Sequence, residues 1–178
     1  QALGPWAEAL LRFAVGAAMV PHGMRMCLGY FKGTGGPVDS VPKVGAFYDK
    51  RGYKPGWLWA YGTVLTQFVA APCVALGLFT RPMALVLFVL LVLSAYDHAK
   101  YDGYFWNKIG LEYPAMWAIG VLYFVIHGGG PISLDRLIGP GVIPRFAEVR
   151  TTARAKAPAR SRALVVRGKR RGQSRTQY

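Results

Sequence analysis

The sequence predicts an all-α protein, an integral membrane four-helix bundle with a basic C-terminal tail. Two uncharged apolar runs follow each other closely, Leu58 to Phe79 and Pro82 to Ala95. Hydrophobic residues make up 53% of the chain and charged residues 17%. Of the 22 lysines and arginines, 12 lie from Arg136 onward beside a single acid, so that segment carries +11 of the net +14. We therefore expect a membrane domain over residues 1–139 and an extramembrane tail over 140–178.

The lengths of these two runs predict a membrane hairpin. Leu58 to Phe79 contains 22 residues, which at about 1.5 Å per residue cover roughly the 30 Å hydrocarbon core of a bilayer. Only Thr80 and Arg81 separate it from the second run, so the second helix has to return antiparallel to the first. Proline suits the first turn of a helix, as Pro82 does here. We place these spans at about residues 57–79 and 82–98.

Two further spans flank this hairpin. The first, at about residues 7–28, is apolar apart from Glu8, Arg12, His22 and Arg25, and Arg12 near its start can extend its guanidinium to the headgroups. The last, at about residues 112–127, begins at Glu112 and ends at three consecutive glycines. It is short for a bilayer unless it tilts.

The two long connections are predicted to lie outside the membrane. Residues 29–56 are rich in glycine, proline and charge, with room for a short surface helix at 44–50. Residues 96–111 mix charges with aromatic side chains, which commonly anchor a span at the membrane interface. The two cysteines, Cys27 and Cys73, lie in apolar runs without metal-site spacing, which favours buried thiols.

Four spans place both termini on the same side of the membrane. That side has 13 lysines and arginines, the tail's 12 and Arg81, against eight on the other, so we expect cytoplasmic termini. A bacterial inner membrane is the default location, and an organelle inner membrane after removal of a transit peptide is the alternative. Because the basic charge is confined to the tail, we expect it to contact anionic lipid or an acidic face of a neighbouring subunit, and we expect no nucleic-acid partner.

The topology brings polar side chains to the outer membrane face. They are His22, Arg25, His98 and Glu112, with Gln67 deeper in the second span. A polar residue inside a span usually faces other helices. For Gln67 we weigh an interhelical hydrogen bond against contact with a ligand such as a quinone carbonyl, in a tentative cofactor site formed by all five residues.

Other cofactors and reactions have weaker support in the sequence. His22 and His98 fit the axial ligands of a b-type haem, but no other feature marks a haem pocket, so quinone is the one cofactor that we consider. We expect no metal site, because no fixed spacing of ligands is present. Hydrolase, protease and nucleotide-binding motifs are absent from the sequence, and we assign no catalytic residue.

Several segments resemble the DoxX-like family of small four-span membrane proteins. They are LLRFAVGAAMVPHGMR, LGLFTRPMAL, the Asp97-His98 pair, LEYPAMW and GGGPISLDRLIG, in that order over residues 8–139. The family's motif residues fall on Arg12, His22, Gly23, Arg25, Arg81, Glu112, Ser133 and Asp135. The chain has Gln67 where many members have a glutamate, and Arg25 where many have a lysine.

The resemblance implies a role in redox chemistry at the membrane, because some members are subunits of a thiosulfate:quinone oxidoreductase. We expect an accessory subunit of a larger redox or energy-converting complex of respiratory or photosynthetic type, structural or quinone-associated, and not an enzyme on its own. The alternative is the quinone-reducing subunit itself. A small transporter is disfavoured, because the sequence has no inverted repeat and no broken helix at mid-membrane.

Overall fold

The computed structural model describes residues 3–31, 33–34 and 40–138, and this part of the chain is helical, without strands. The helices are α1 (Gly4–Leu28), α2 (Val41–Lys50), α3 (Gly56–Leu65), the π-helix η1 (Thr66–Ala70), α4 (Ala71–Leu76), α5 (Thr80–Tyr101), the 3₁₀ helix η2 (Trp106–Lys108), α6 (Glu112–His127) and α7 (Leu134–Ile138). The predicted tail, 140–178, lies outside the described residues. The predicted all-α class is confirmed for this part.

The predicted second span is a single rod made of α3, η1 and α4. It runs without interruption from Gly56 to Leu76, and the π-helical turn lies in its middle. Gly77 ends the rod with a left-handed backbone, φ 73°, a conformation that costs glycine least. The turn that follows is short, and α5 starts at Thr80. This rod and α5 are both long and apolar enough to span a membrane.

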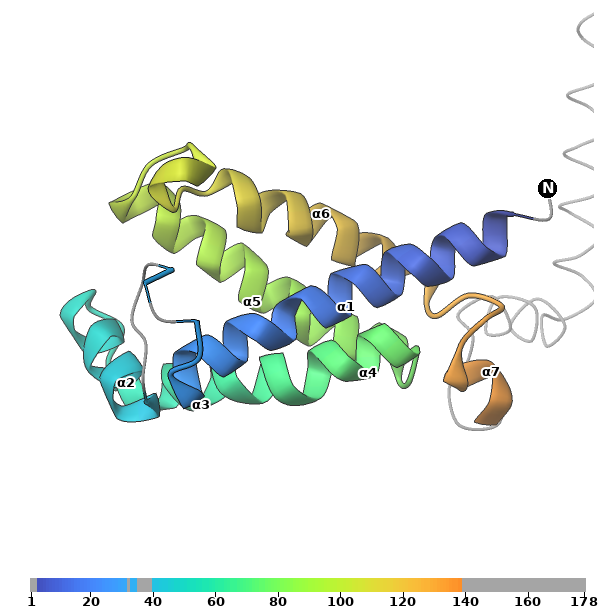
Figure 1. Ribbon diagram of the computed structural model, residues 1–178, viewed down its shortest axis with the longest axis horizontal. Helices are drawn as coiled ribbons and strands as arrows, with labels where there is room; N and C mark the ends of the chain where they lie inside the picture. Colours follow the sequence, from blue (N-terminus) through green and yellow to red (C-terminus); the bar gives the residue numbers. More distant parts are fainter. Residues whose placement is uncertain (1–2, 32, 35–39, 139–178) are drawn as a thin grey trace, which may run out of the picture. The chain divides into compact units, whose positions relative to one another are not determined.

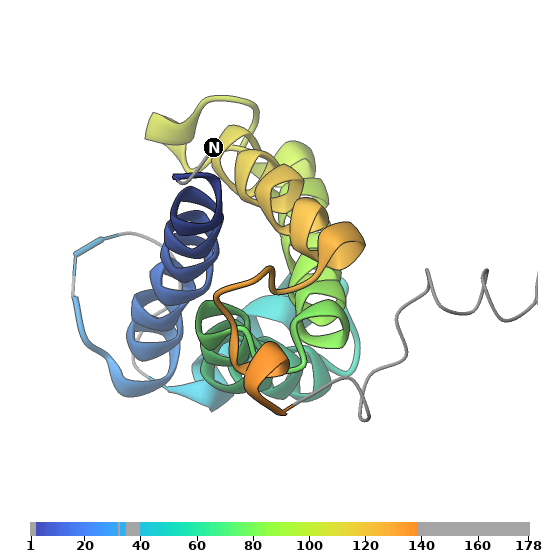
Figure 2. The same cartoon turned by 90° about the vertical axis from the view of Figure 1, so that its right-hand side faces the viewer.

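The core is shared by α1, α4, α5 and α6, which lie around it in Figures 1 and 2. Its largest fully buried side chain is Phe124, and Leu87, Val15 and Val74 are also fully buried. Lipid is as apolar as these side chains, so close packing rather than escape from water holds such helices together. α1 packs closely on α4 at Gly16, where a Cβ would lie 2.5 Å from the backbone oxygen of Ala71.

The outward side of α5 is apolar as well. Leu85, Val86, Val89 and Val92 are 43–50% exposed, whereas Ala84, Leu87 and Leu91 face the core. A helix that is apolar on both sides is typical of a membrane span. The two cysteines, predicted to be buried, are free and half-buried.

The connection between α1 and α3 contains more helix than the predicted 44–50. α2 begins at Val41, with Pro42 in its first turn, and packs on α3. Val44 of α2 is fully buried. At Gly56, a Cβ would collide with the backbone oxygen of Gly45, so this pair of glycines lets the two helices touch. α2 therefore lies against the start of α3.

Candidate functional site

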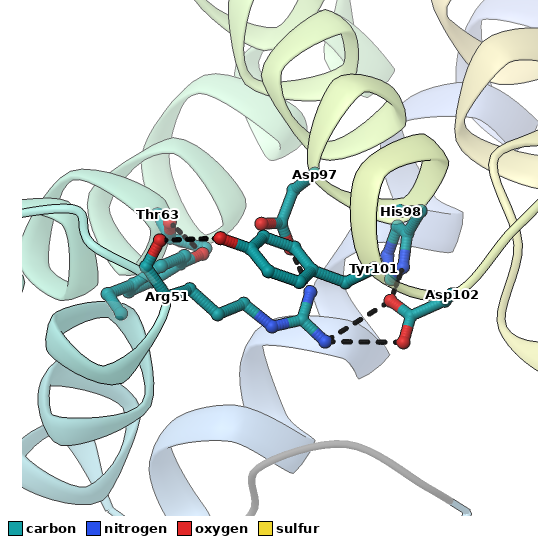
Figure 3. Close-up of polar contacts among 7 residues, drawn as sticks. Arg51, Thr63, Asp97, His98, Tyr101 and Asp102 are labelled. Carbon is teal, nitrogen blue, oxygen red and sulfur yellow. Dashed lines mark hydrogen bonds and ion pairs between the residues drawn. The ribbon is translucent and has the colours of Figure 1, made fainter.

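A charged cluster connects the end of α2 to the end of α5 (Figure 3). Arg51, the residue that follows α2, forms an ion pair with Asp97, and its Nη2 lies 3.2 Å from Asp102 Oδ2. The guanidinium carbon is 4.3 Å from the centre of the Phe47 ring and 4.7 Å from that of Tyr101. Ion pairs and cation–π contacts together hold a planar arginine in one orientation. We call Arg51, Asp97, His98, Tyr101 and Asp102 the outer cluster.

Two further hydrogen bonds belong to the outer cluster, one within α5 and one from α5 to the backbone of Arg51. His98 Nδ1 is 2.9 Å from Asp102 Oδ2, one helical turn away. The hydroxyl of Tyr101 donates to the backbone oxygen of Arg51, at 2.8 Å. The cluster contains two carboxylates and one arginine, and a second cation lies beside it, because Lys100 Nζ is 4.9 Å from the centre of the Tyr101 ring. These contacts hold the segment that follows α2 against the end of α5.

Two tyrosines extend the outer cluster toward α3. The hydroxyl of Tyr48 lies 3.1 Å from Thr63 Oγ1, and burial raises the pKa of Tyr48. Burial, with the neighbouring Asp97 carboxylate, raises the pKa of Tyr53 to about 12. Both phenols therefore stay protonated at neutral pH and can donate a hydrogen bond.

Gln67 lies in the π-helix, inside the bundle. It is 6% exposed, and its Oε1 has no hydrogen-bond partner among the described residues. Its side chain lies against Gly23 of α1, where a Cβ would be 3.1 Å from Gln67 Cβ and 3.2 Å from Gln67 Oε1. The absence of a side chain at Gly23 thus makes room for Gln67. π-helical turns are rare and are often found at functional sites.

The structure distributes the five predicted quinone contacts over several surroundings. Arg25 donates to the backbone oxygen of Thr34. Gly23 faces Gln67, and Arg25, two positions further along α1, points about 160° away from it around the helix. His98 pairs with Asp102 in the outer cluster. Glu112 accepts a hydrogen bond from the backbone of Trp106, at 3.2 Å. His22 is partly buried on α1. His98 and Glu112 have partners outside this set of five, and quinone binding by any of the five stays a prediction.

Other unpartnered groups are few in the described part of the chain. Besides Gln67 Oε1, the buried side-chain atoms without a hydrogen-bond partner are Arg25 Nε, Asp97 Oδ1 and Trp117 Nε1. The described residues contain no group of three histidine, cysteine, aspartate or glutamate side chains close enough to hold a metal ion. Two of these four unpartnered atoms belong to the outer cluster and to Gln67.

Comparison with known families decides the relationship. The family model for DoxX matches residues 7–100, more than half of the chain. The chain belongs to the DoxX family. Neither a curated protein nor a solved structure matches it. The assignment confirms the resemblance seen in the sequence. A membrane protein family also agrees with the two apolar helices of spanning length in the structure.

Several DoxX motif residues form a second polar network, at the opposite end of the helices. Arg12, 4% exposed, donates to the backbone oxygen of Gly129 and, at 2.8 Å, to that of Ile132. Its Nε is 3.4 Å from the oxygen of Ala75. α1, α4 and the segment 129–132 therefore meet at one guanidinium. We call Arg12 with its three carbonyl partners the Arg12 clamp. Snorkelling, expected from the sequence, is replaced by burial, because these carbonyls supply the partners that water would otherwise supply.

Asp135 completes this network by capping α5. Its carboxylate accepts hydrogen bonds from the backbone nitrogens of Phe79 and Thr80, at 2.6 and 2.9 Å, and from the Thr80 hydroxyl at 2.6 Å. The first amides of a helix have no partner within it, and a carboxylate there is favourable. Arg12 and Asp135 therefore both hold segments that are distant in the sequence together.

Sequence reasoning missed Arg51, the centre of the outer cluster. It lies in a loop sequence of glycine, lysine and tyrosine that gives no indication of a partner. One signal was available, namely Asp97 at the end of an apolar helix, since a buried carboxylate needs a cation. Lysines and arginines from both long connections were equally eligible. The sequence therefore indicates that a partner exists without identifying it.

Proposed function

We propose that this DoxX protein is a four-span integral membrane protein with both termini on the cytoplasmic side. It serves as an accessory subunit of a larger redox or energy-converting complex, of respiratory or photosynthetic type. The observation that carries the membrane part is the apolar outward side of α5, described above. α1 and α6 share one core with the two helices of spanning length, so they cross the same bilayer beside them.

The polar contacts support an accessory role over independent catalysis. His98 and Glu112 have partners within the chain, and the Arg12 clamp is occupied by backbone carbonyls. Groups committed to such contacts hold helices and loops in place. A scaffold that presents a rigid surface to other subunits needs this arrangement. The basic tail adds the means of docking, on anionic lipid or on an acidic subunit surface.

Gentle detergent extraction from the native membrane tests this proposal. Native electrophoresis and mass spectrometry of the band identify what migrates with the chain, and an absorption spectrum identifies bound chromophores. We expect the chain to travel within a large complex and to leave it when the tail after Arg145 is removed. A chain that migrates alone contradicts the accessory role, and bound quinone in that band supports the second candidate.

A second candidate function is that of a quinone-reducing subunit, as in a thiosulfate:quinone oxidoreductase. The observation that favours it is the buried, unpartnered Oε1 of Gln67, since a buried acceptor without a donor is costly. The hydroxyl of a quinol would supply the donor. Gln67→Leu then abolishes electron transfer to quinone, whereas in the scaffold it leaves the transfer of the whole complex near normal. Val69→Leu, on the exposed side of the same π-helix, is the matched control.

A further inference from the structure

A stripe of polar side chains runs along the buried side of the α3–η1 rod. Thr63, Thr66 and Gln67 are 5%, 7% and 6% exposed. Positions i, i+3 and i+4 of a helix share one face, so these three side chains line the same side. On the outward side, Leu65 and Val69 are 64% and 46% exposed. The rod therefore has one face for lipid and one polar face toward the bundle.

The outer end of this stripe is continuous with the outer cluster. Thr63 Oγ1 lies 3.1 Å from the hydroxyl of Tyr48, and both Arg51 and Asp97 act electrostatically on that hydroxyl. Figure 3 shows Thr63 facing the same space as Arg51 and Asp97. Polar groups thus follow one another from the extramembrane segment into the bundle.

Both ends of this succession have an oxygen that lacks a donor. Asp97 Oδ1 is buried and unpartnered at the outer end, and Gln67 Oε1 is buried and unpartnered at the inner end. Protein interiors normally satisfy such acceptors, with ordered water where protein donors are missing. Between them, the Thr63 and Thr66 hydroxyls are about one helical turn apart, a spacing that water molecules can bridge.

We propose that Thr63, Thr66 and Gln67 form a water-accessible track from the outer face of the membrane to the middle of the bundle. The proposal rests on the membrane topology proposed above and extends it. Such a track lets a group held beside Gln67 exchange protons with the outer aqueous phase. The Arg51–Asp97 pair lies at its mouth.

A dry packing of the same residues is the rival explanation. Thr66 Oγ1 donates to the backbone oxygen of Gly62, at 2.8 Å, which satisfies its hydroxyl within the helix. Gln67 Oε1 lies against Gly23, where a Cβ would be 3.2 Å away, so the two helices pack tightly there. In that case the stripe is a set of satisfied or weakly satisfied side chains, and neither water nor ions enter.

Cysteine accessibility separates the two explanations. Single cysteines are placed in the full chain, in sealed vesicles of native membrane, after Cys27→Ser and Cys73→Ser. Silver ions in chloride-free buffer are small, charged and specific for thiols. Thiols that silver has blocked escape maleimide labelling after denaturation. Thr66→Cys tests the track, and Leu65→Cys, one position away and facing lipid, is the matched control. Thr63→Cys replaces Thr66→Cys if the latter fails to accumulate.

We expect Thr66→Cys to be blocked at least about tenfold faster than Leu65→Cys, because silver reacts with the thiolate, which forms only in contact with water. A rate equal to that of Leu65→Cys overturns the track. Asn107→Cys, in the connection between α5 and α6, reports the outer face independently. If silver reaches Asn107→Cys from one side and Thr66→Cys only from the other, the track is refuted. If both react only from the cytoplasmic side, the proposed orientation fails and the track stands.

Discussion

Replacing Arg12 by leucine should destabilise the helical domain more than any surface change. The guanidinium is buried and makes two close hydrogen bonds, to the backbone oxygens of Gly129 and Ile132. Hydrogen bonds to a charged group contribute about 1.5–3 kcal/mol each. Their combined loss is about 3–6 kcal/mol, and a single substitution rarely costs more than about 5 kcal/mol. We therefore expect a loss of about 3–5 kcal/mol.

The assay for Arg12→Leu is the apparent melting temperature in detergent, read from the folded peak in size-exclusion chromatography after heating. At about 2–4 °C per kcal/mol for a chain of this size, the expected decrease is roughly 6–20 °C. Arg136→Leu, at an exposed arginine, controls for the loss of a positive charge, and should change stability by less than about 0.5 kcal/mol. A decrease for Arg12→Leu no larger than that of Arg136→Leu would refute the reasoning.

Three further outcomes are expected. Gly16→Ala places a Cβ 2.5 Å from backbone atoms of α4 and should lower thermal stability by about 1–3 kcal/mol, whereas Gly62→Ala, with open space around it, should be neutral or stabilising by up to about 1 kcal/mol. Arg51→Ala leaves Asp97 without its cation, so chymotrypsin should cleave residues 44–55 faster than in the wild type; unchanged cleavage would show that the outer cluster does not hold this segment. Absorbance at 295 nm should show Tyr53, by difference from Tyr53→Phe, ionising near pH 12. The pKa of Tyr53 in the folded protein exceeds the value of about 10 expected in the unfolded chain. The contribution of Tyr53 to stability is therefore complete below pH 10 and is lost between pH 10 and 12. Ionisation near pH 10 would mean that Tyr53 is not held against Asp97.

The positions of the long helices follow from local sequence, and so they were predictable. Uncharged runs of spanning length predicted helices at 57–79 and 82–98, and the structure has helical rods at Gly56–Leu76 and Thr80–Tyr101. The first rod ends three residues earlier than predicted, and the cause is local, because Gly77 adopts a left-handed backbone and stops the rod before Phe79. The π-turn at Gln67 was not predictable, because no residue type marks it.

The polar networks were not predictable, because their partners are far apart in the chain. Arg51 and Asp97 are separated by 46 positions, and Asp135 caps a helix that begins 55 positions earlier. Charge alone indicates that such residues need partners, and many pairings satisfy that requirement equally. Four polar residues at one membrane face, with Gln67 deeper, were therefore grouped by topology, and topology does not reveal the direction in which each side chain points around its helix.

The contrast between the two ends of the helices and their middle indicates where function lies. Arg12 at one end and Arg51 at the other connect segments distant in sequence, and each is satisfied by protein groups. A bundle stabilised at both ends can tolerate a weaker middle, where Gln67 keeps an unpartnered oxygen within a rare π-turn. Leucine at position 67 would be cheaper if the middle served packing alone. The retained cost favours a partner that comes from outside the chain, and water entering along Thr63 and Thr66 is the partner that the geometry supplies.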